Sequence, residues 1–230
     1  MKTVGIIGGI GPESTIDYYR LIIDTYRKAT ADSGSPSIVI DSVNLQQVLA
    51  YVAANDLPAL TEFLVAEVER LARAGADFAL IAANTPHIVF DAVRTRAPIP
   101  LISIVEATRD AALAGRFQKL GLFGTRFTMQ ATFFFEVFNR AGMTLVVPDD
   151  DDQTFIHDKY MNELGLGIFI DETRDRMLAV GRDLVERHGI QALILGGTEL
   201  PLLLRDASIG VPLLDTTKIH VERAVAELLS

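Results

Sequence analysis

The chain has 230 residues, so it is long enough to bury a sizeable core. Its formal net charge is −9, so nucleic acid is not an expected partner. It contains no cysteine, which excludes disulfides, thiolate metal ligands and thiol nucleophiles. Its apolar runs are too short to cross a membrane, and its first residues lack the pattern of a secretory signal, so we expect a cytoplasmic protein with no membrane contact.

Short apolar runs alternate with longer amphipathic stretches along the chain, a pattern typical of βα units around a mainly parallel sheet. The first half predicts strands at 3–7, 37–42, 77–82 and 100–103, and helices at about 13–31, 58–74, 86–95 and 105–114. The second half predicts strands at 119–123, 143–147, 191–195 and 212–214, and helices at about 128–141, 153–164, 170–188 and 217–229.

The second half repeats motifs of the first at nearly constant spacing. Gly8 and Gly124 each close an apolar run, and the run that leads to Ala83 is echoed by the run that leads to Gly197. The repeat predicts an α/β fold of two pseudosymmetric subdomains, each a mainly parallel sheet flanked by helices, with an active-site cleft between them.

We place the boundary between the halves at Ala114. The first subdomain is then 1–114 and the second is 115–230. The C-terminal helix, 217–230, is able to pack on the first subdomain, so the halves need not be independent.

The first predicted βα turn is rich in glycine and invites a nucleotide-binding interpretation. Glu13, however, puts a carboxylate where a pyrophosphate would lie, and Ser14 takes the place of the last glycine of a dinucleotide motif. We therefore expect a tight turn that admits a small anion or packs closely.

Polar residues follow two corresponding strands. Asn84 and Thr85 follow the third predicted strand, and Thr198 and Glu199 follow its counterpart in the second half. Helix capping, with Thr85 as the N-cap, would explain the first motif alone. Because two copies occur at matching strand ends, we predict a site for a small carboxylate or amino-acid ligand. The residues predicted to bind it are Gly9, Ile10, Asn84, Thr85, Thr125, Thr128, Thr198 and Glu199.

His87 and His220 are candidates for acid or base, but a histidine in this setting is more often a hydrogen-bonded structural residue. Asp149 to Asp152 is a run of four carboxylates. Negative charge is favoured at a helix N-terminus, so we interpret the run as a solvated loop that leads into a helix rather than as a metal site. The sequence predicts no metal ligand set and no cofactor.

At these motifs the chain resembles the aspartate/glutamate racemase superfamily, and within it the amino-acid racemases typified by aspartate racemase and the broad-specificity racemases. The likeness covers almost the whole chain. The motifs that carry it are Gly8-Gly9 with Glu13-Ser14-Thr15, Ala83-Asn84-Thr85-Pro86-His87, Gly124-Thr125-Arg126-Phe127-Thr128-Met129, Glu163-Leu164 before Gly167, Gly196-Gly197-Thr198-Glu199 and Asp215-Thr216-Thr217 with Ile219-His220.

The resemblance implies an isomerase of amino-acid metabolism that uses no cofactor. In that family two cysteines on opposite faces of the substrate exchange the Cα proton, one removing it and the other returning it. The corresponding positions here are Ala83 and Gly197, and neither a methyl group nor a hydrogen atom can exchange a proton. We therefore expect a ligand-binding protein without two-base racemisation, in which restoring both cysteines would produce racemisation.

Two alternatives stay open. The chain could be an active enzyme in which Glu199, His87 or a water molecule replaces the missing acid/base groups. It could also be a metabolite-responsive binding protein. Because members of the family often pair, a homodimer is a further option.

Overall fold

The computed structural model describes residues 2–30 and 34–230, which form two compact units. Unit 1 runs to Ile104 and resumes at Thr217, and unit 2 is Val105–Thr216. The division lies at the start of helix α5 (Ile104–Ala114), whereas the sequence places the boundary at the end of this segment.

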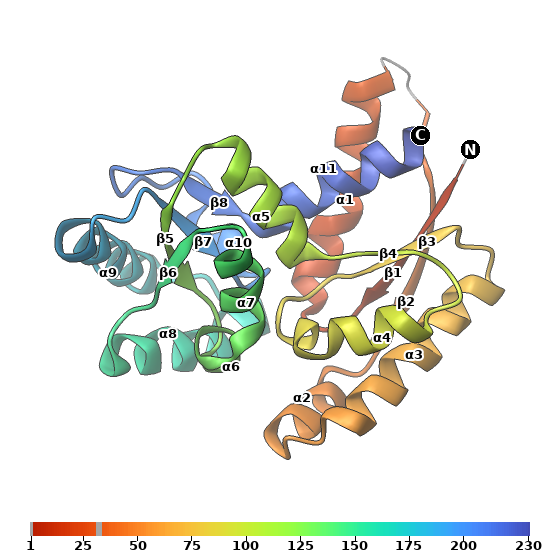
Figure 1. Ribbon diagram of the computed structural model, residues 1–230, viewed down its shortest axis with the longest axis horizontal. Coiled ribbons are helices and arrows are strands. Elements are labelled where there is room, and N and C mark those ends of the chain that lie inside the picture. The colour runs from red at the N-terminus through yellow and green to blue at the C-terminus, as the bar shows by residue number, and fades with distance from the viewer. Residues whose placement is uncertain (1, 31–33) are drawn as a thin grey trace. The chain divides into compact units, whose positions relative to one another are not determined.

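Unit 1 contains a four-stranded parallel sheet (Figure 1). Its strands are β1 (Thr3–Gly8), β2 (Ser37–Ser42), β3 (Phe78–Ile81) and β4 (Leu101–Ile102), and they lie in the order β2-β1-β3-β4. The chain passes from β1 to one neighbour and later returns to the other, so β1 and β3 flank the point where the strand order reverses. Loops at the carboxyl ends of such a strand pair are where open α/β sheets bind ligands.

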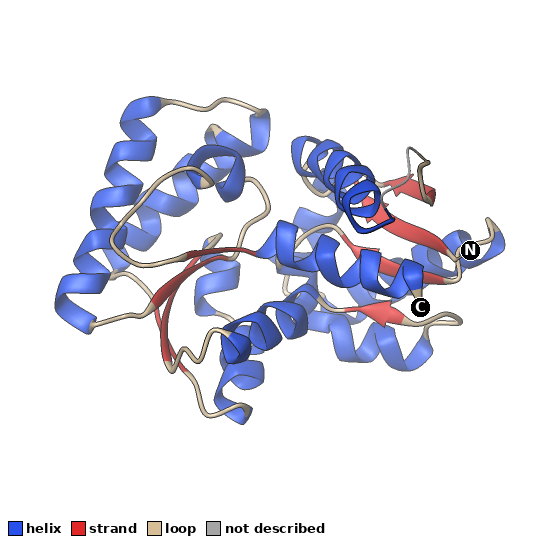
Figure 2. Cartoon of the chain, turned by 90° about the horizontal axis from the view of Figure 1, so that it is seen from above, coloured by secondary structure: helices blue, strands red, loops and turns tan. Residues whose placement is uncertain are grey.

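Helices cover both faces of this sheet. They are α1 (Pro12–Thr30), α2 (Leu45–Ala53), α3 (Leu57–Arg73), the 3₁₀ helix η1 (Thr85–Val89), α4 (Phe90–Arg96) and α11 (Thr216–Leu229). On one face α1 and α11 pack against Ile6 and Leu80, while α3 packs on the other face, where Leu71 lies beside Gly5 (Figures 1 and 2). This alternation along β1 follows the two-residue period of a strand.

Unit 2 has the same strand order as unit 1. Its parallel strands are β5 (Lys119–Phe123), β6 (Thr144–Val146), β7 (Ala192–Leu195) and β8 (Leu213–Asp215), in the order β6-β5-β7-β8. Each strand therefore occupies the place of its counterpart in the first half. The predicted fold of two similar α/β units, each a parallel sheet flanked by helices, is confirmed.

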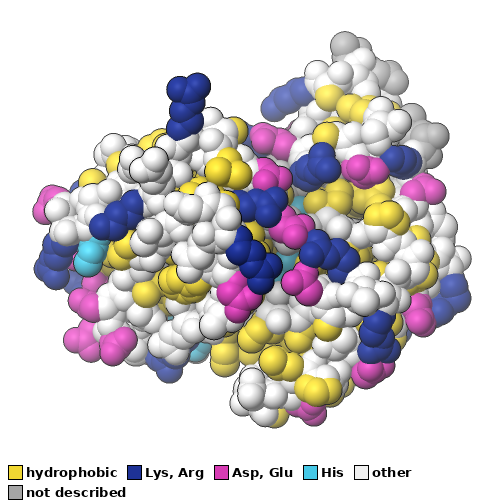
Figure 3. Space-filling view, viewed as in Figure 1, with side chains coloured by type: hydrophobic (Ala, Val, Ile, Leu, Met, Phe, Trp, Pro, Cys, Tyr) yellow, Lys and Arg dark blue, Asp and Glu magenta, His cyan; other side chains and the backbone are white. Residues whose placement is uncertain are grey.

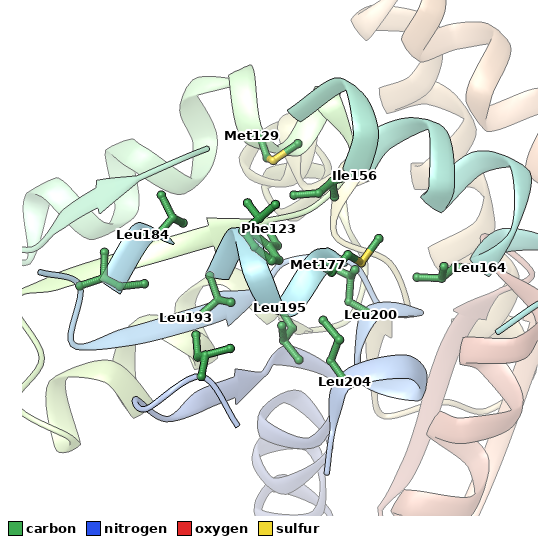
Figure 4. Close-up of a cluster of buried hydrophobic side chains, with 13 residues drawn as sticks. Phe123, Met129, Ile156, Leu164, Met177, Leu184, Leu193, Leu195, Leu200 and Leu204 are labelled. Carbon is green, nitrogen blue, oxygen red and sulfur yellow. The ribbon is translucent and has the colours of Figure 1, made fainter. Parts of the chain in front are cut away.

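A hydrophobic cluster joins several helices of unit 2 to β5 and β7 (Figure 4). The helices of this unit are α5, α6 (Arg126–Gln130), α7 (Thr132–Arg140), α8 (Asp150–Asn162), the 3₁₀ helix η2 (Leu164–Leu166), α9 (Asp171–His188) and α10 (Leu200–Leu204). The cluster contains Phe123 and Leu195 of the strands together with Ile156 of α8, Met177 of α9 and Leu204 of α10. The cluster thus positions α8 and α10 beside the sheet.

Two helices of the structure, α2 and α10, are absent from the sequence prediction. Helix α2 buries only Val48 and Val52, so its apolar pattern is short, and Asn44 caps it by accepting a hydrogen bond from the Gln46 amide. Helix α10 has only 5 residues and follows Glu199 directly. Segments this short give too few apolar positions for a helical period to be recognised.

The structure also corrects two helix boundaries. The predicted helix 128–141 is two helices, α6 and α7, because the backbone of Ala131 between them is extended. The predicted helix 153–164 begins earlier, at Asp150, because Asp149 accepts a hydrogen bond from the Asp152 amide at 3.0 Å and caps α8. Most of the aspartate run therefore lies in the first helical turn rather than in a loop.

The surface of each unit carries charges of both signs. On the face shown in Figure 3, Lys and Arg side chains are interspersed with Asp and Glu. Within residues 2–30 and 34–230, no helix is both long and apolar enough to cross a bilayer.

Candidate active site

The glycine turn after β1 packs closely within unit 1. Gly9 has a φ of +79°, and a Cβ atom there would lie 2.3 Å from the carbonyl oxygen of Val43. The Gly9 amide donates a hydrogen bond to Thr15 Oγ1 at 2.9 Å. Glycine is therefore required by close packing, one of the two roles expected for this turn, and the Gly9 amide already has a partner inside the protein.

The segment after β3 lies beside this turn, because the Ala82 amide donates to the Ile7 carbonyl at 2.9 Å. Ala83 and Asn84 are 5% and 3% exposed. The helix that follows begins at Thr85, so Thr85 is not the N-cap that the sequence suggests, and the Asn84 side chain makes no capping bond either. Helix capping thus does not account for this motif.

The imidazole of His87 is committed to the backbone. Its Nδ1 donates to the Ala83 carbonyl at 3.0 Å, and its Nε2 accepts from the Ile104 amide at 3.3 Å. Burial, followed by the nearby His220 ring, lowers the pKa of His87 from 6.5 to about 3. The neutral ring therefore joins the end of β3 to the segment after β4, as a structural histidine would.

His220 has the same character. Its Nδ1 accepts from the Tyr18 hydroxyl at 2.8 Å and its Nε2 donates to the Ile102 carbonyl at 3.0 Å. Burial lowers its pKa to about 4. Both rings thus fix the carboxyl edge of the unit 1 sheet through backbone groups, and His220 does so through the Tyr18 hydroxyl as well.

In unit 2 the segment after β7 repeats the arrangement after β3. The Gly196 amide donates to the Phe123 carbonyl at 2.7 Å, as the Ala82 amide does to Ile7, which makes Gly197 the counterpart of Ala83. Thr198 and Glu199 follow and are 1% and 2% exposed. As in unit 1, no side chain caps the helix that begins here.

Thr125 and Thr128 lie in the neighbouring loop after β5. Thr125 Oγ1 accepts from the Thr128 amide at 3.2 Å and so caps α6, and the two hydroxyl oxygens are also 3.2 Å apart. The Thr128 side chain lies against the backbone at Gly124 and Gly196. The structure therefore brings Thr125, Thr128, Thr198 and Glu199 to the carboxyl edge of the unit 2 sheet. Gly9, Asn84 and Thr85 lie at the carboxyl edge of the unit 1 sheet.

Tyr160, at the end of α8, is a residue of this edge that the sequence motifs do not single out. Its hydroxyl donates to Glu199 Oε2, and Thr198 Oγ1 donates to the same oxygen at 3.1 Å. The ring lies over Gly197, where a Cβ atom would come within 2.4 Å of Tyr160 Cε2 and 3.0 Å of its hydroxyl oxygen. Burial and the Glu199 carboxylate raise the pKa of Tyr160 well above its usual value, so the phenol stays protonated.

The aspartate run takes part in local structure. Asp149 caps α8, and Asp152 forms an ion pair with Arg176 at 2.8 Å. In the part of the chain that the structure describes, no three His, Asp or Glu side chains are grouped so that they could hold a metal ion.

A family model described as Asp/Glu/Hydantoin racemase matches residues 7–224 of the chain. The chain belongs to this family. A protein from Yersinia pestis assigned as an Asp/Glu racemase has a crystal structure that is 33% identical over 100% of both chains, with a TM-score of 0.88.

Other family members match the chain over nearly its whole length. The crystal structure of an aspartate racemase homologue from Pyrococcus horikoshii OT3 is 31% identical over 100% of both chains, with a TM-score of 0.86. The broad specificity amino-acid racemase RacX of Bacillus subtilis (strain 168) is 22% identical and covers 99% of this chain and 98% of its own length. The family likeness therefore extends over both units, and the resemblance stated from the sequence motifs is confirmed.

Proposed function

We propose that this member of the Asp/Glu racemase family binds a small amino acid or dicarboxylate but does not racemise it by the two-thiol mechanism. The observation that carries the proposal is the contrast between the polar residues after the strands and the two positions beside them in the sequence. Polar side chains remain at the carboxyl edges of both sheets, whereas the two positions that the family uses for proton exchange hold Ala83 and Gly197.

The groups proposed to recognise the ligand lie where the strand order of each sheet reverses, after β1 and β3 in unit 1 and after β5 and β7 in unit 2. Unit 1 offers the Asn84 amide and the Thr85 hydroxyl, and unit 2 offers the hydroxyls of Thr125, Thr128 and Thr198. Amide and hydroxyl groups can donate to the carboxylate or accept from the ammonium group of an amino acid, and the ends of β1/β3 and β5/β7 are where such folds bind ligands.

The loss of two-base chemistry follows from the residue types. Removing a Cα proton and returning it from the other side needs a titratable group on each side. Ala83 and Gly197 provide none, and His87 is a poor substitute because both of its ring nitrogens bond the backbone and its pKa is about 3. The sequence suggests two side chains, His87 and Glu199, as replacement acid/base groups, and we retain only Glu199.

The class of ligand is inferred from the relatives. RacX is a broad specificity amino-acid racemase, and the Pyrococcus protein is an aspartate racemase homologue. We therefore expect aspartate, glutamate and other small amino acids to be the first ligands to test, with dicarboxylates such as malate beside them.

A thermal-shift screen tests this function. A ligand present at about one hundred times its dissociation constant should stabilise the folded protein by about 2.7 kcal/mol. The proposal predicts that at least one enantiomer of a small amino acid, or one dicarboxylate, raises the melting temperature in a saturable manner. If no compound of the set does so, the edge residues do not form a carboxylate site and the proposal is wrong.

A further inference from the structure

We propose that Tyr160 is a catalytic residue of this site and that, backed by Glu199, it exchanges the Cα proton of a bound amino acid from one side only. The inference rests on the proposed function, since it takes the ligand to be an amino acid bound at the edge of unit 2. Because Gly197 has no side chain, the inference assigns to Tyr160 the role that a side chain at position 197 would have.

The position of the Tyr160 hydroxyl supports this role. Its oxygen lies 3.0 Å from the point where a Cβ atom of residue 197 would be, so it lies in the space that a side chain at that position would use. The ring packs against the hydrophobic cluster of unit 2, and its hydroxyl is bonded to Glu199. Because the Tyr160 ring and hydroxyl are both fixed, the hydroxyl oxygen is well suited to proton transfer, which requires a fixed distance to the reacting atom.

Glu199 supplies the base that a protonated phenol lacks. Its Oε2 accepts from the hydroxyls of both Tyr160 and Thr198, and its side chain is buried. Because the pKa of Tyr160 is raised, a free phenolate is strongly disfavoured beside this carboxylate. The tyrosine can therefore act only if it passes its own proton to Glu199 as it takes another.

The step balances without a cofactor. The Cα–H bond of the ligand breaks, its proton moves to the Tyr160 oxygen, and the electron pair stays on the ligand as a carbanion delocalised into its carboxylate. At the same time the phenolic proton of Tyr160 moves to Glu199 Oε2. Tyr160 is neutral before and after the step, and Glu199 becomes a carboxylic acid. After the protons held by Tyr160 and Glu199 exchange with solvent, the reverse step returns a solvent-derived proton to the same side of Cα.

The side chain at position 83 decides the stereochemical result. The resemblance assigns the second proton exchange to this position, and Ala83 has only a methyl group. A carbanion formed by Tyr160 and Glu199 is then reprotonated by the same pair. We expect Cα hydrogen to exchange with solvent in one enantiomer, with retention of configuration.

Deuterium exchange tests this inference directly. The amino acid found by the thermal-shift screen is incubated with the protein in deuterated water, each enantiomer separately, and analysed by mass spectrometry and chiral chromatography. The wild-type protein should introduce deuterium at Cα of one enantiomer without inverting it. Tyr160→Phe, which keeps the ring over Gly197, should slow this exchange about 100-fold or more.

Two further variants complete the experiment. Glu199→Gln cannot accept the proton and should lose the exchange to the same extent, even if Tyr160→Phe is poorly folded. Tyr19→Phe is the matched control, because Tyr19 is 47% exposed on α1 and should exchange like wild type.

The outcomes separate this inference from the proposed function. If a ligand binds but no deuterium enters, the role of Tyr160 is wrong and ligand binding stands. Exchange that is unchanged in Tyr160→Phe and Glu199→Gln, or inversion of either enantiomer, also overturns the inference. If only a dicarboxylate stabilises the protein, this inference fails and the proposed function stands. If no compound of the screen stabilises it, both proposals fail.

Discussion

Gly197 and Tyr160 are complementary in shape, since the tyrosine ring occupies the space that any side chain at position 197 would need. This contact changes one expectation from the sequence. A cysteine at position 197 would meet the Tyr160 ring, so we expect that restoring the two thiols at positions 83 and 197 alone does not produce racemisation. Tyr160 would have to be shortened as well.

The contact predicts a strong coupling between the two residues. Gly197→Ala places a Cβ atom 2.4 Å from Tyr160 Cε2, and this overpacking should lower the free energy of unfolding by about 1–3 kcal/mol. In a Tyr160→Ala background the same substitution should have little effect, because the ring is absent. Urea unfolding of the four proteins of this double-mutant cycle measures the coupling. Equal losses in both backgrounds would show that the ring does not fill this space.

At the scale of elements, two buried histidines join strands and helices of unit 1. His87 links η1 to Ile104, and His220 links α11 to β4 and to Tyr18 of α1. Their pKa values of about 3 and 4 lie below the ordinary 6.5, so the folded protein keeps them neutral while the unfolded chain takes up protons below about 6.5. Stability therefore falls as the pH is lowered from 6.5 to about 4.

Glu67 on α3 acts in the opposite direction. Burial, and then the neighbouring Asp41 carboxylate, raises its pKa from 4.5 to about 7, even though Arg70 forms an ion pair with it. The folded protein thus binds a proton at Glu67 between pH 7 and 4.5 that the unfolded chain does not bind. Over this range, Glu67 adds stability as the pH falls and partly offsets the histidines.

Acid titration of stability tests this balance. Each histidine should lower the free energy of unfolding by on the order of 1 kcal/mol per pH unit below pH 6.5, and Glu67→Gln should steepen the net loss because it removes the offset. Chemical unfolding of the wild-type protein and the variant at several pH values between 7 and 4.5 gives the two slopes. Identical slopes would show that Glu67 does not titrate in this range.

The sequence predicted most elements of the fold and named several residues of the candidate site. Strands such as β1 and β7 are apolar runs whose residue types favour a buried sheet, and the internal repeat places their ends correctly. Short elements such as α2 carry too little pattern to be recognised. Tyr160 could not be found, because its contact with Gly197 depends on how α8 packs against β7, and no spacing in the sequence encodes that packing.

At the scale of the whole molecule, the two units repeat one strand order and bring matching polar segments to matching sheet edges. The proposed function requires groups of both units for ligand recognition. We predict that Asn84→Ala in unit 1 and Thr198→Val in unit 2 each weaken ligand binding about tenfold, because each removes a hydrogen-bonding group. Calorimetric titration measures both dissociation constants, and Thr95→Val, an exposed position on α4, is the control. Unchanged affinity in either variant would remove that unit from the ligand site.

The central claim is that the chain retains ligand recognition without the residues that invert an amino acid. Chiral chromatography tests it most directly, after prolonged incubation of the wild-type protein with each pure enantiomer of its ligand at saturating concentration. We predict that each enantiomer remains as supplied. Conversion of either enantiomer into a racemic mixture by this cysteine-free chain would contradict the account.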